Sequence, residues 1–103
     1  MGDISPIISN DILFRYMFIT DFMPVNNYRQ RDGTIYRYSM NGEVRVVVVD
    51  SRLIAPQGVT VDVAAQRLFW VDSYRDVVEM SDYEGHGRCV IGFLSLIRII
   101  ILE

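Results

Sequence analysis

The chain has 103 residues, which suffices for one small domain but not for several independent cores. Half of its residues are hydrophobic and 22% are charged, a composition that excludes an intrinsically disordered protein. The formal net charge of −3 gives no general attraction to polyanions, so we expect no nucleic-acid partner and no direct membrane contact.

Short runs of β-branched and aromatic residues alternate with turn residues along the chain, and helical periodicity is nearly absent. This pattern predicts an all-β fold. Residues 1–14 carry no clear strand pattern and no secretory signal, so we leave them as an N-terminal segment of unassigned structure. The strands that we expect after it lie at residues 15–20, 34–39, 44–49, 59–62, 68–72, 77–82 and 88–92.

A strand-turn-strand segment occurs twice, with a fixed spacing. Gly42 and Gly85 are 43 residues apart, as are Arg45 and Arg88. A period near 40–45 residues in a strand-rich chain is typical of β-propeller blades, each a small sheet that cannot bury both faces alone. We therefore expect about two blades of four-stranded antiparallel sheet, with a first repeat at 15–57 and a second at 58–92.

The first repeat contains an insertion. Asp21 and Asp72 end equivalent strands, but they are 51 residues apart rather than 43, so eight extra residues lie between Asp21 and the next strand. The inserted stretch, 22–33, is rich in polar residues, Pro, Asn and Gly, which predicts a surface loop. The expected first strand of this repeat, upstream of residue 15, is not evident from the sequence.

The second repeat is followed by an apolar tail, residues 93–103, that fits no further blade. Its apolar run is shorter than the roughly 20 residues that span a bilayer, and Arg98 interrupts it. The single cysteine, Cys89, excludes an internal disulfide. Cys89 falls in an apolar strand pattern, so we expect it to be a small buried hydrophobic residue.

Two segments carry a resemblance to a known family. Met-Phe-Ile-Thr-Asp at 17–21 and Leu-Phe-Trp-Val-Asp at 68–72 resemble the Tyr-Trp-Thr-Asp (YWTD) motif of the class B repeats of the low-density lipoprotein receptor and its megalin-like relatives. The resemblance covers about residues 15–92. It implies a partial YWTD-type β-propeller, of which the remaining blades and the flanking EGF-like modules are missing from this sequence.

The resemblance also implies structural roles for the motif residues. Phe18, Phe69 and Trp70 would pack between neighbouring blades. Asp21 and Asp72 would tie the backbone of one blade to that of the next. These roles are structural, so no catalytic, metal-binding or cofactor-binding residue is expected, and the compact acidic loop of a calcium site is missing.

For function, the resemblance implies a non-enzymatic ligand-binding module of an endocytic receptor, with protein or lipoprotein ligands. Such a module lies on the extracellular side of the cell-surface and endosomal membrane. Candidate ligand contacts are Arg29, Arg31 and Arg37, which could meet an acidic partner. His86 is a candidate pH sensor, because histidine titrates between pH 5 and 8.

Two alternatives remain open. One is a calcium-dependent propeller hydrolase, which would need Glu, Asn and Asp side chains that converge on a central channel. The other is a truncated product without independent function, because two blades expose broad apolar faces and at least three repeats are usually needed for stability. Metal titration tests the first alternative, and cooperative melting of a soluble chain tests the second.

Overall fold

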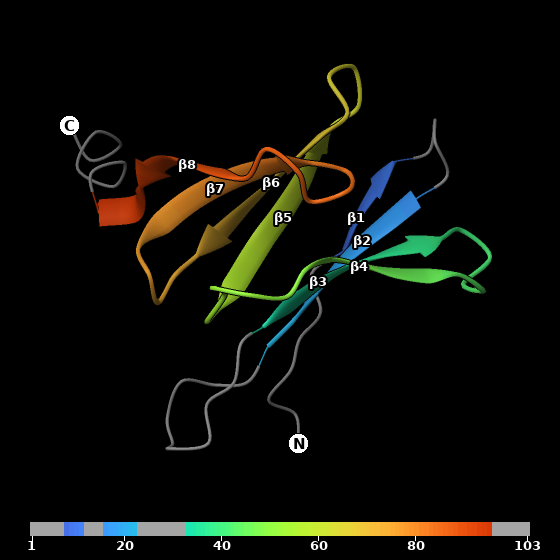
Figure 1. Cartoon of the computed structure of the whole chain (residues 1–103), viewed down its shortest axis with the longest axis horizontal. Helices are drawn as coiled ribbons and strands as arrows, with labels where there is room; N and C mark the ends of the chain where they lie inside the picture. Colours follow the sequence, from blue (N-terminus) through green and yellow to red (C-terminus); the bar gives the residue numbers. More distant parts are fainter. Residues whose placement is uncertain (1–7, 12–15, 23–32, 96–103) are drawn as a thin grey trace.

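The chain forms two four-stranded antiparallel sheets that lie side by side (Figure 1). The computed structural model describes residues 8–11, 16–22 and 33–95. The first sheet contains β1 (Ile8–Asp11), β2 (Tyr16–Asp21), β3 (Thr34–Ser39) and β4 (Arg45–Val49). The second contains β5 (Pro56–Asp62), β6 (Arg67–Asp72), β7 (Val77–Asp82) and β8 (Cys89–Phe93). Both sheets are simple meanders, which confirms the predicted all-β fold with two propeller-type blades.

The seven expected strands are present, and the largest difference is that β5 begins at Pro56 instead of 59. One further strand, β1, lies within segment 1–14, for which the sequence predicts no strand, and it pairs with β2 from Ile8 opposite Ile19 to Asp11 opposite Tyr16. Its sequence, Ile-Ser-Asn-Asp, is dominated by residues that favour turns, so pairing with β2 rather than local propensity makes it a strand.

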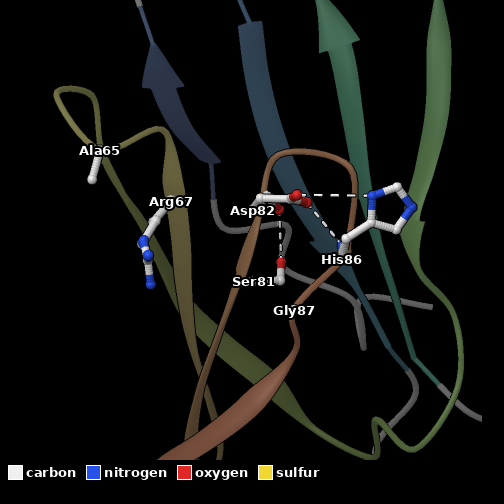
Figure 2. A pocket seen from close by; sticks show the side chains of 6 residues that line it. All are labelled: Ala65, Arg67, Ser81, Asp82, His86 and Gly87. Atoms are coloured by element: carbon white, nitrogen blue, oxygen red, sulfur yellow. Dashed lines mark hydrogen bonds and ion pairs between the residues drawn. The ribbon is translucent and has the colours of Figure 1, made fainter.

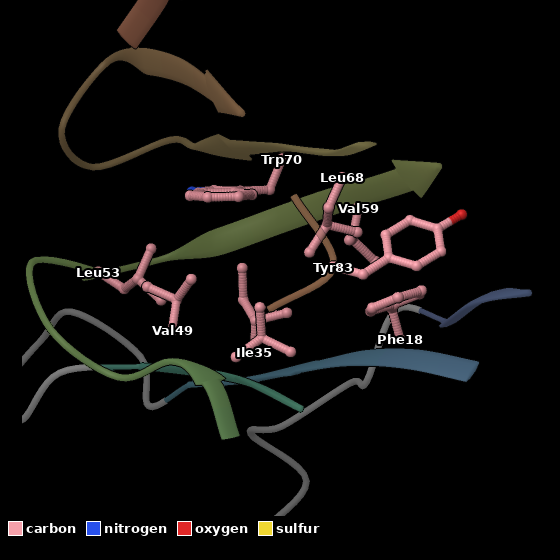
Figure 3. Packing of buried hydrophobic residues seen from close by; sticks show 9 residues of the cluster. Phe18, Ile35, Val49, Leu53, Val59, Leu68, Trp70 and Tyr83 are labelled. Carbon is pink, nitrogen blue, oxygen red and sulfur yellow. The ribbon is translucent and has the colours of Figure 1, made fainter. Parts of the chain in front are cut away.

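The core lies between the two sheets (Figure 3). Phe18 and Ile35 project from the first sheet, Leu68 and Trp70 project from the second, and Leu53 comes from the link that joins them; all five are fully buried. At about 1.5–3 kcal/mol for each large apolar side chain removed from water, this cluster is the main favourable contribution to docking of the sheets.

Each sheet uses only one of its faces in this core. In β6, Leu68 and Trp70 are buried against the first sheet, whereas Phe69 lies half-buried on the opposite face. In β2 the buried and half-buried motif positions are exchanged relative to β6. Phe18 is buried against the second sheet, and Ile19 is half-buried on the opposite face. The same motif position therefore faces different ways in the two repeats: Phe18 faces the core between the sheets, whereas its counterpart Phe69 faces away from it.

Strand β8 forms the outer edge of the second sheet, and its side chains are largely uncovered. Cys89 is exposed, so the expectation of a buried thiol is wrong. Val90, Ile91 and Phe93 of the same strand are also exposed. Among the described residues, no helix has the length and apolarity needed to cross a membrane.

The corner between β7 and β8 touches the backbone of β4 at Gly85. This glycine has φ +88°, and a Cβ atom there would collide with the carbonyl oxygen of Val48 in the first sheet. Gly42, at the equivalent corner of the first sheet, has φ +77° but nothing within 4 Å of its hypothetical Cβ. Glycine is thus required at Gly85 for two reasons, backbone conformation and close approach of the sheets.

The two glycines give a matched test of this contact. Gly42→Ala should lower the free energy of unfolding by about 1–2 kcal/mol, the cost of left-handed backbone for alanine. Gly85→Ala should lower it by roughly a further 1–3 kcal/mol, because the sheets must move apart. Urea unfolding followed by circular dichroism, at one protein concentration, measures both; equal losses would contradict the close approach.

Candidate functional site

The connections of the two sheets gather at one end of the structure. We call this end the link rim. Three segments meet there: the sheet-to-sheet link 50–55, the β6–β7 turn 73–76, and the ends of the β2–β3 connection, Phe22 and Gly33. Two backbone hydrogen bonds hold it together: Gly33 N donates to Leu53 O at 2.7 Å, and Ser73 N donates to Ala55 O at 3.2 Å. The predicted loop 22–33 starts and ends at this rim; residues 23–32, with Arg29 and Arg31, lie outside the described residues.

Asp72 holds the link to the second sheet. Its fully buried carboxylate accepts hydrogen bonds from the backbone N–H groups of Ile54, at 2.8 Å, and Ala55, at 3.1 Å. It also accepts from Arg75 N at 3.2 Å, which closes the β6–β7 turn. A carboxylate that accepts three backbone hydrogen bonds is a strong structural anchor, because loss of the side chain would leave buried donors without a partner.

Glu79 forms the second anchor, one strand away on the same face. Glu79 is 2% exposed, and its carboxylate accepts hydrogen bonds from Trp70 Nε1 at 3.1 Å, Arg75 Nη1 at 3.1 Å and Arg88 Nη2 at 2.9 Å. Both arginines also bind the link: Arg75 Nη1 and Arg88 Nη2 donate hydrogen bonds to the carbonyl oxygen of Arg52 at 2.6 and 2.8 Å. One buried carboxylate thus orients two cations that bind the link backbone.

The charge state of Glu79 follows from these contacts. Burial by itself raises the pKa of Glu79, but the hydrogen bond and positive charge of Arg88, followed by those of Arg75, outweigh burial and hold the pKa below its ordinary value. Glu79 is therefore ionised in the folded chain near neutral pH. An ionised Glu79 keeps both arginines in place on the link.

A second contact between the sheets lies at the β7–β8 corner. Tyr83 packs on Phe18 with a ring-centroid distance of 4.9 Å, and Tyr16 completes the aromatic group. Arg37 lies 4.5 Å from the centre of the Tyr16 ring, donates to Tyr83 O at 3.2 Å and forms an ion pair with Glu84 at 2.8 Å. The structure therefore places Arg37 between the sheets, and its predicted contact with a ligand stays a prediction.

A small pocket of about 290 Å³ lies at the opposite end of the second sheet from the link rim (Figure 2). Ser81, Asp82 and His86 line it, which are the three residue types of a serine-hydrolase triad. They do not form a triad, because their hydrogen bonds instead hold the turn between β7 and β8. Ser81 Oγ donates its single proton to the backbone oxygen of Asp82 at 2.8 Å, and Asp82 Oδ1 accepts from His86 N at 2.8 Å. A triad requires the serine to donate to the histidine.

His86, the candidate pH sensor, is a surface residue of this corner. Its side chain is 81% exposed, and its Nδ1 lies 3.8 Å from Asp82 Oδ2. The described residues contain no group of three or more His, Cys, Asp or Glu side chains arranged to hold a metal ion. The role of His86 in pH sensing remains a prediction.

The remaining motif residues occupy the outer faces of the two sheets. Phe69 lies on the face of the second sheet that points away from the first. Asp21 lies on the corresponding outer face of the first sheet, where its Oδ1 atom is buried without a hydrogen-bond partner among the residues described. Its counterpart Asp72 is fully satisfied, so the two equivalent aspartates differ in their surroundings.

Tyr74 is a surface residue that was not predicted from the sequence. This residue lies in the β6–β7 turn of the link rim and is 63% exposed, the largest exposed fraction among the large hydrophobic side chains described. The exposed Arg52, with φ +55°, lies in the neighbouring link. An aromatic residue within a turn of polar residues, Asp-Ser-Tyr-Arg-Asp, is the sequence signal that could have indicated it.

Comparisons with known proteins agree with the fold. A β-propeller chain in the crystal structure of a nidogen/laminin complex superimposes with a TM-score of 0.71 and 33% identity, over 86% of this chain and 32% of that chain. Protein cueball of Drosophila erecta and of Drosophila yakuba is 34% and 38% identical over 61 residues, 56% of this chain. The chain spans about a tenth of the length of these curated relatives. No family model matches. The two sheets are thus blades of a YWTD-like β-propeller.

The Asp72 anchor can be tested by truncation. Asp72→Ala leaves the backbone N–H groups of Ile54, Ala55 and Arg75 without an acceptor, so it should lower the free energy of unfolding by about 2–5 kcal/mol. Asp50→Ala, at an exposed position just after β4, should change it by less than about 0.5 kcal/mol. Urea unfolding at one protein concentration measures both, and similar effects would argue against the anchor.

The Glu79 network predicts acid sensitivity. Because the folded pKa lies below the ordinary value of 4.5, ionised Glu79 contributes stability that is complete above that pH and is lost as the pH falls through the folded pKa. Glu79→Gln should be less stable at pH 7 and should lose less stability on acidification than the parent. Glu84→Gln, which alters a half-exposed ion pair, is the control and should lower the free energy of unfolding at pH 7 by no more than about 1 kcal/mol. Parallel profiles for the parent and Glu79→Gln would contradict the assignment.

Proposed function

We propose that the chain is a non-enzymatic, protein-binding propeller module that acts on the extracellular side of the membrane. The observation that carries the proposal is the likeness to a β-propeller found in a protein–protein complex, at 33% identity and over most of this chain. Propeller folds host many functions, so the fold alone would not suffice. The surface chemistry of the link rim adds the second line of support.

The link rim has the properties of a protein-contact surface. Tyr74 projects from it, and aromatic side chains dominate the energetics of protein interfaces. The hydrogen bonds of Asp72 and Arg75 hold the turn that carries Tyr74, so the ring is presented on a rigid support. The connection 22–33, with Arg29 and Arg31, begins and ends at the same rim and could extend this surface.

The finer proposal is that the module belongs to an endocytic receptor related to the low-density lipoprotein receptor and has protein or lipoprotein ligands. The YWTD-like motifs at 17–21 and 68–72 support it. In that setting His86, exposed on the opposite rim, is the candidate that would respond to endosomal pH. The matrix-type alternative, suggested by the nidogen/laminin likeness, shares the same protein-binding surface.

Two probes separate these versions. Purified laminin and low-density lipoprotein particles are each passed over the immobilised chain near neutral pH, and saturable binding is measured by biolayer interferometry. Binding of the lipoprotein supports the receptor version, and binding of laminin supports the matrix version. Binding of either should weaken about tenfold or more in Tyr74→Ser, because a central aromatic contact is removed.

Val44→Ser is the matched control. Val44 is 57% exposed in the β3–β4 turn at the opposite end of the first sheet, so its truncation should leave binding unchanged. Absence of saturable binding to both probes would overturn the proposed partner classes. Equal binding by Tyr74→Ser and Val44→Ser would overturn the assignment of the link rim.

A further inference from the structure

The second sheet has an apolar face on the side away from the first sheet. Phe69 pairs there with Met80, and Val71 pairs with Val78, and we call this the open face. All four side chains are half-buried, whereas the other face of the same strands packs against the first sheet. An apolar sheet face of this kind is stabilised by a covering layer.

The open face corresponds to the face by which the first sheet contacts the second. Val78 lies 43 residues after Ile35, and Phe69 has the motif position of Phe18. Ile35 and Phe18 are fully buried in the core between the sheets. That core also contains Leu53, which comes from the link 50–55 rather than from a strand. Part of the cover of this face in the first sheet is therefore a leucine of the link that follows β4.

Strand pairing keeps the two repeats in step up to the end of β8. In the first sheet Ile35 pairs with Val49, and a register shift lies directly beside this pair. In the second sheet Val78 pairs with Gly92, and the same register shift lies beside it. Both residues of the second pair lie 43 positions after those of the first. The fourth strands of the two repeats therefore end at equivalent places.

The same spacing, continued past β8, assigns counterparts to the link residues. Leu96 corresponds to Leu53, and Ile97 corresponds to Ile54, so the dipeptide Leu-Ile follows the fourth strand at the same distance in both repeats. Residue 96 and those after it lie outside the described residues. The sequence and the pairing of the preceding strands identify Leu96 as the counterpart of the leucine that covers the first sheet.

The chain leaves β8 in the direction that this correspondence requires. Leu94 N donates to Asp76 O at 3.1 Å, and Ser95 donates through N and Oγ to the Asp76 carboxylate at 2.9 and 2.8 Å. Asp76 directly precedes β7, which lies on the side of β8 away from its free edge. In the first repeat the counterpart of Asp76 is Gly33, which also binds the link, through different atoms, at Leu53. After both fourth strands the chain thus turns back toward its own sheet.

We propose that residues 96 and 97 continue a second link, in which Leu96 packs on the open face against Val78. Leu53 has the same place in the cluster that contains Ile35 (Figure 3). The other face of the second sheet is occupied by the first sheet, so the open face is the one available to a segment that turns toward β7. Contact between the two aliphatic side chains removes both from water and stabilises the folded chain. The contact does not depend on the proposed ligand-binding role.

Protection of a thiol on the open face is the first test. In the full chain, Cys89→Ser removes the only native thiol, and Val78→Cys then places one on the open face. Its rate of reaction with the thiol reagent DTNB should rise about tenfold or more when Leu96→Ser is added, because the side chain that covers it is shortened and made polar. An unchanged rate would overturn the proposal.

Val90→Cys, in the same background, is the matched control. Val90 pairs with Glu79, so it lies on the other face of the same sheet, and it is 44% exposed. Leu96→Ser should leave its reaction rate unchanged. An equal rise at both thiols would mean that Leu96 acts on the whole sheet rather than at the open face, and it would also overturn the proposal. Circular dichroism confirms beforehand that the variants retain their sheets, and Leu96→Ala replaces Leu96→Ser if the latter unfolds.

A double-mutant cycle tests the contact itself. Val78→Ala and Leu96→Ala are measured alone and together by urea unfolding of the full chain. If the two side chains touch, the unfolding equilibrium constant of the double variant should differ by about threefold or more from the value that the two single effects predict when multiplied. The cycle of Leu96→Ala with Val90→Ala should be multiplicative within that limit. Multiplicative effects in both cycles would overturn the contact between Leu96 and Val78.

Discussion

The ionised carboxylate of Glu79 fixes how the two sheets meet. It orients Arg75 and Arg88, and both arginines bind the backbone of the link, while the adjacent Asp72 binds two further link N–H groups. The position of the link in turn sets the position of Leu53 in the core between the sheets. Apolar burial supplies most of the free energy, but these directional contacts select one relative position of the sheets.

The acidic character of the second sheet has a structural explanation. Its carboxylates could have indicated a cation site or a surface for basic ligands. Instead, Asp72 and Glu79 hold the link, Asp76 binds Ser95, Asp82 caps the β7–β8 corner, and Glu84 pairs with Arg37 of the first sheet. The charges that are conspicuous in the sequence are used within the protein, and the surface that we propose for binding is instead marked by Tyr74.

Much of the fold followed from the sequence because strand alternation, glycine corners and a constant spacing are local signals. The 43-residue spacing of Gly42 and Gly85 was sufficient to predict two equivalent sheets. Strand β1 could not be predicted from the sequence, because its pairing with β2, not its own residues, makes it a strand. The burial of Glu79 could not be predicted either, since it depends on Arg88, nine residues away, and on the distant link. Cys89 was misjudged because an apolar strand pattern does not reveal that the strand lies at an edge.

The position of Trp70 has an optical consequence. It is the only tryptophan of the chain, it is fully buried between the sheets, and its indole N–H donates to the buried Glu79. Its fluorescence therefore originates from the seam between the two blades and from nowhere else. Emission wavelength and quenching by iodide report directly on whether that seam is closed, without an added label.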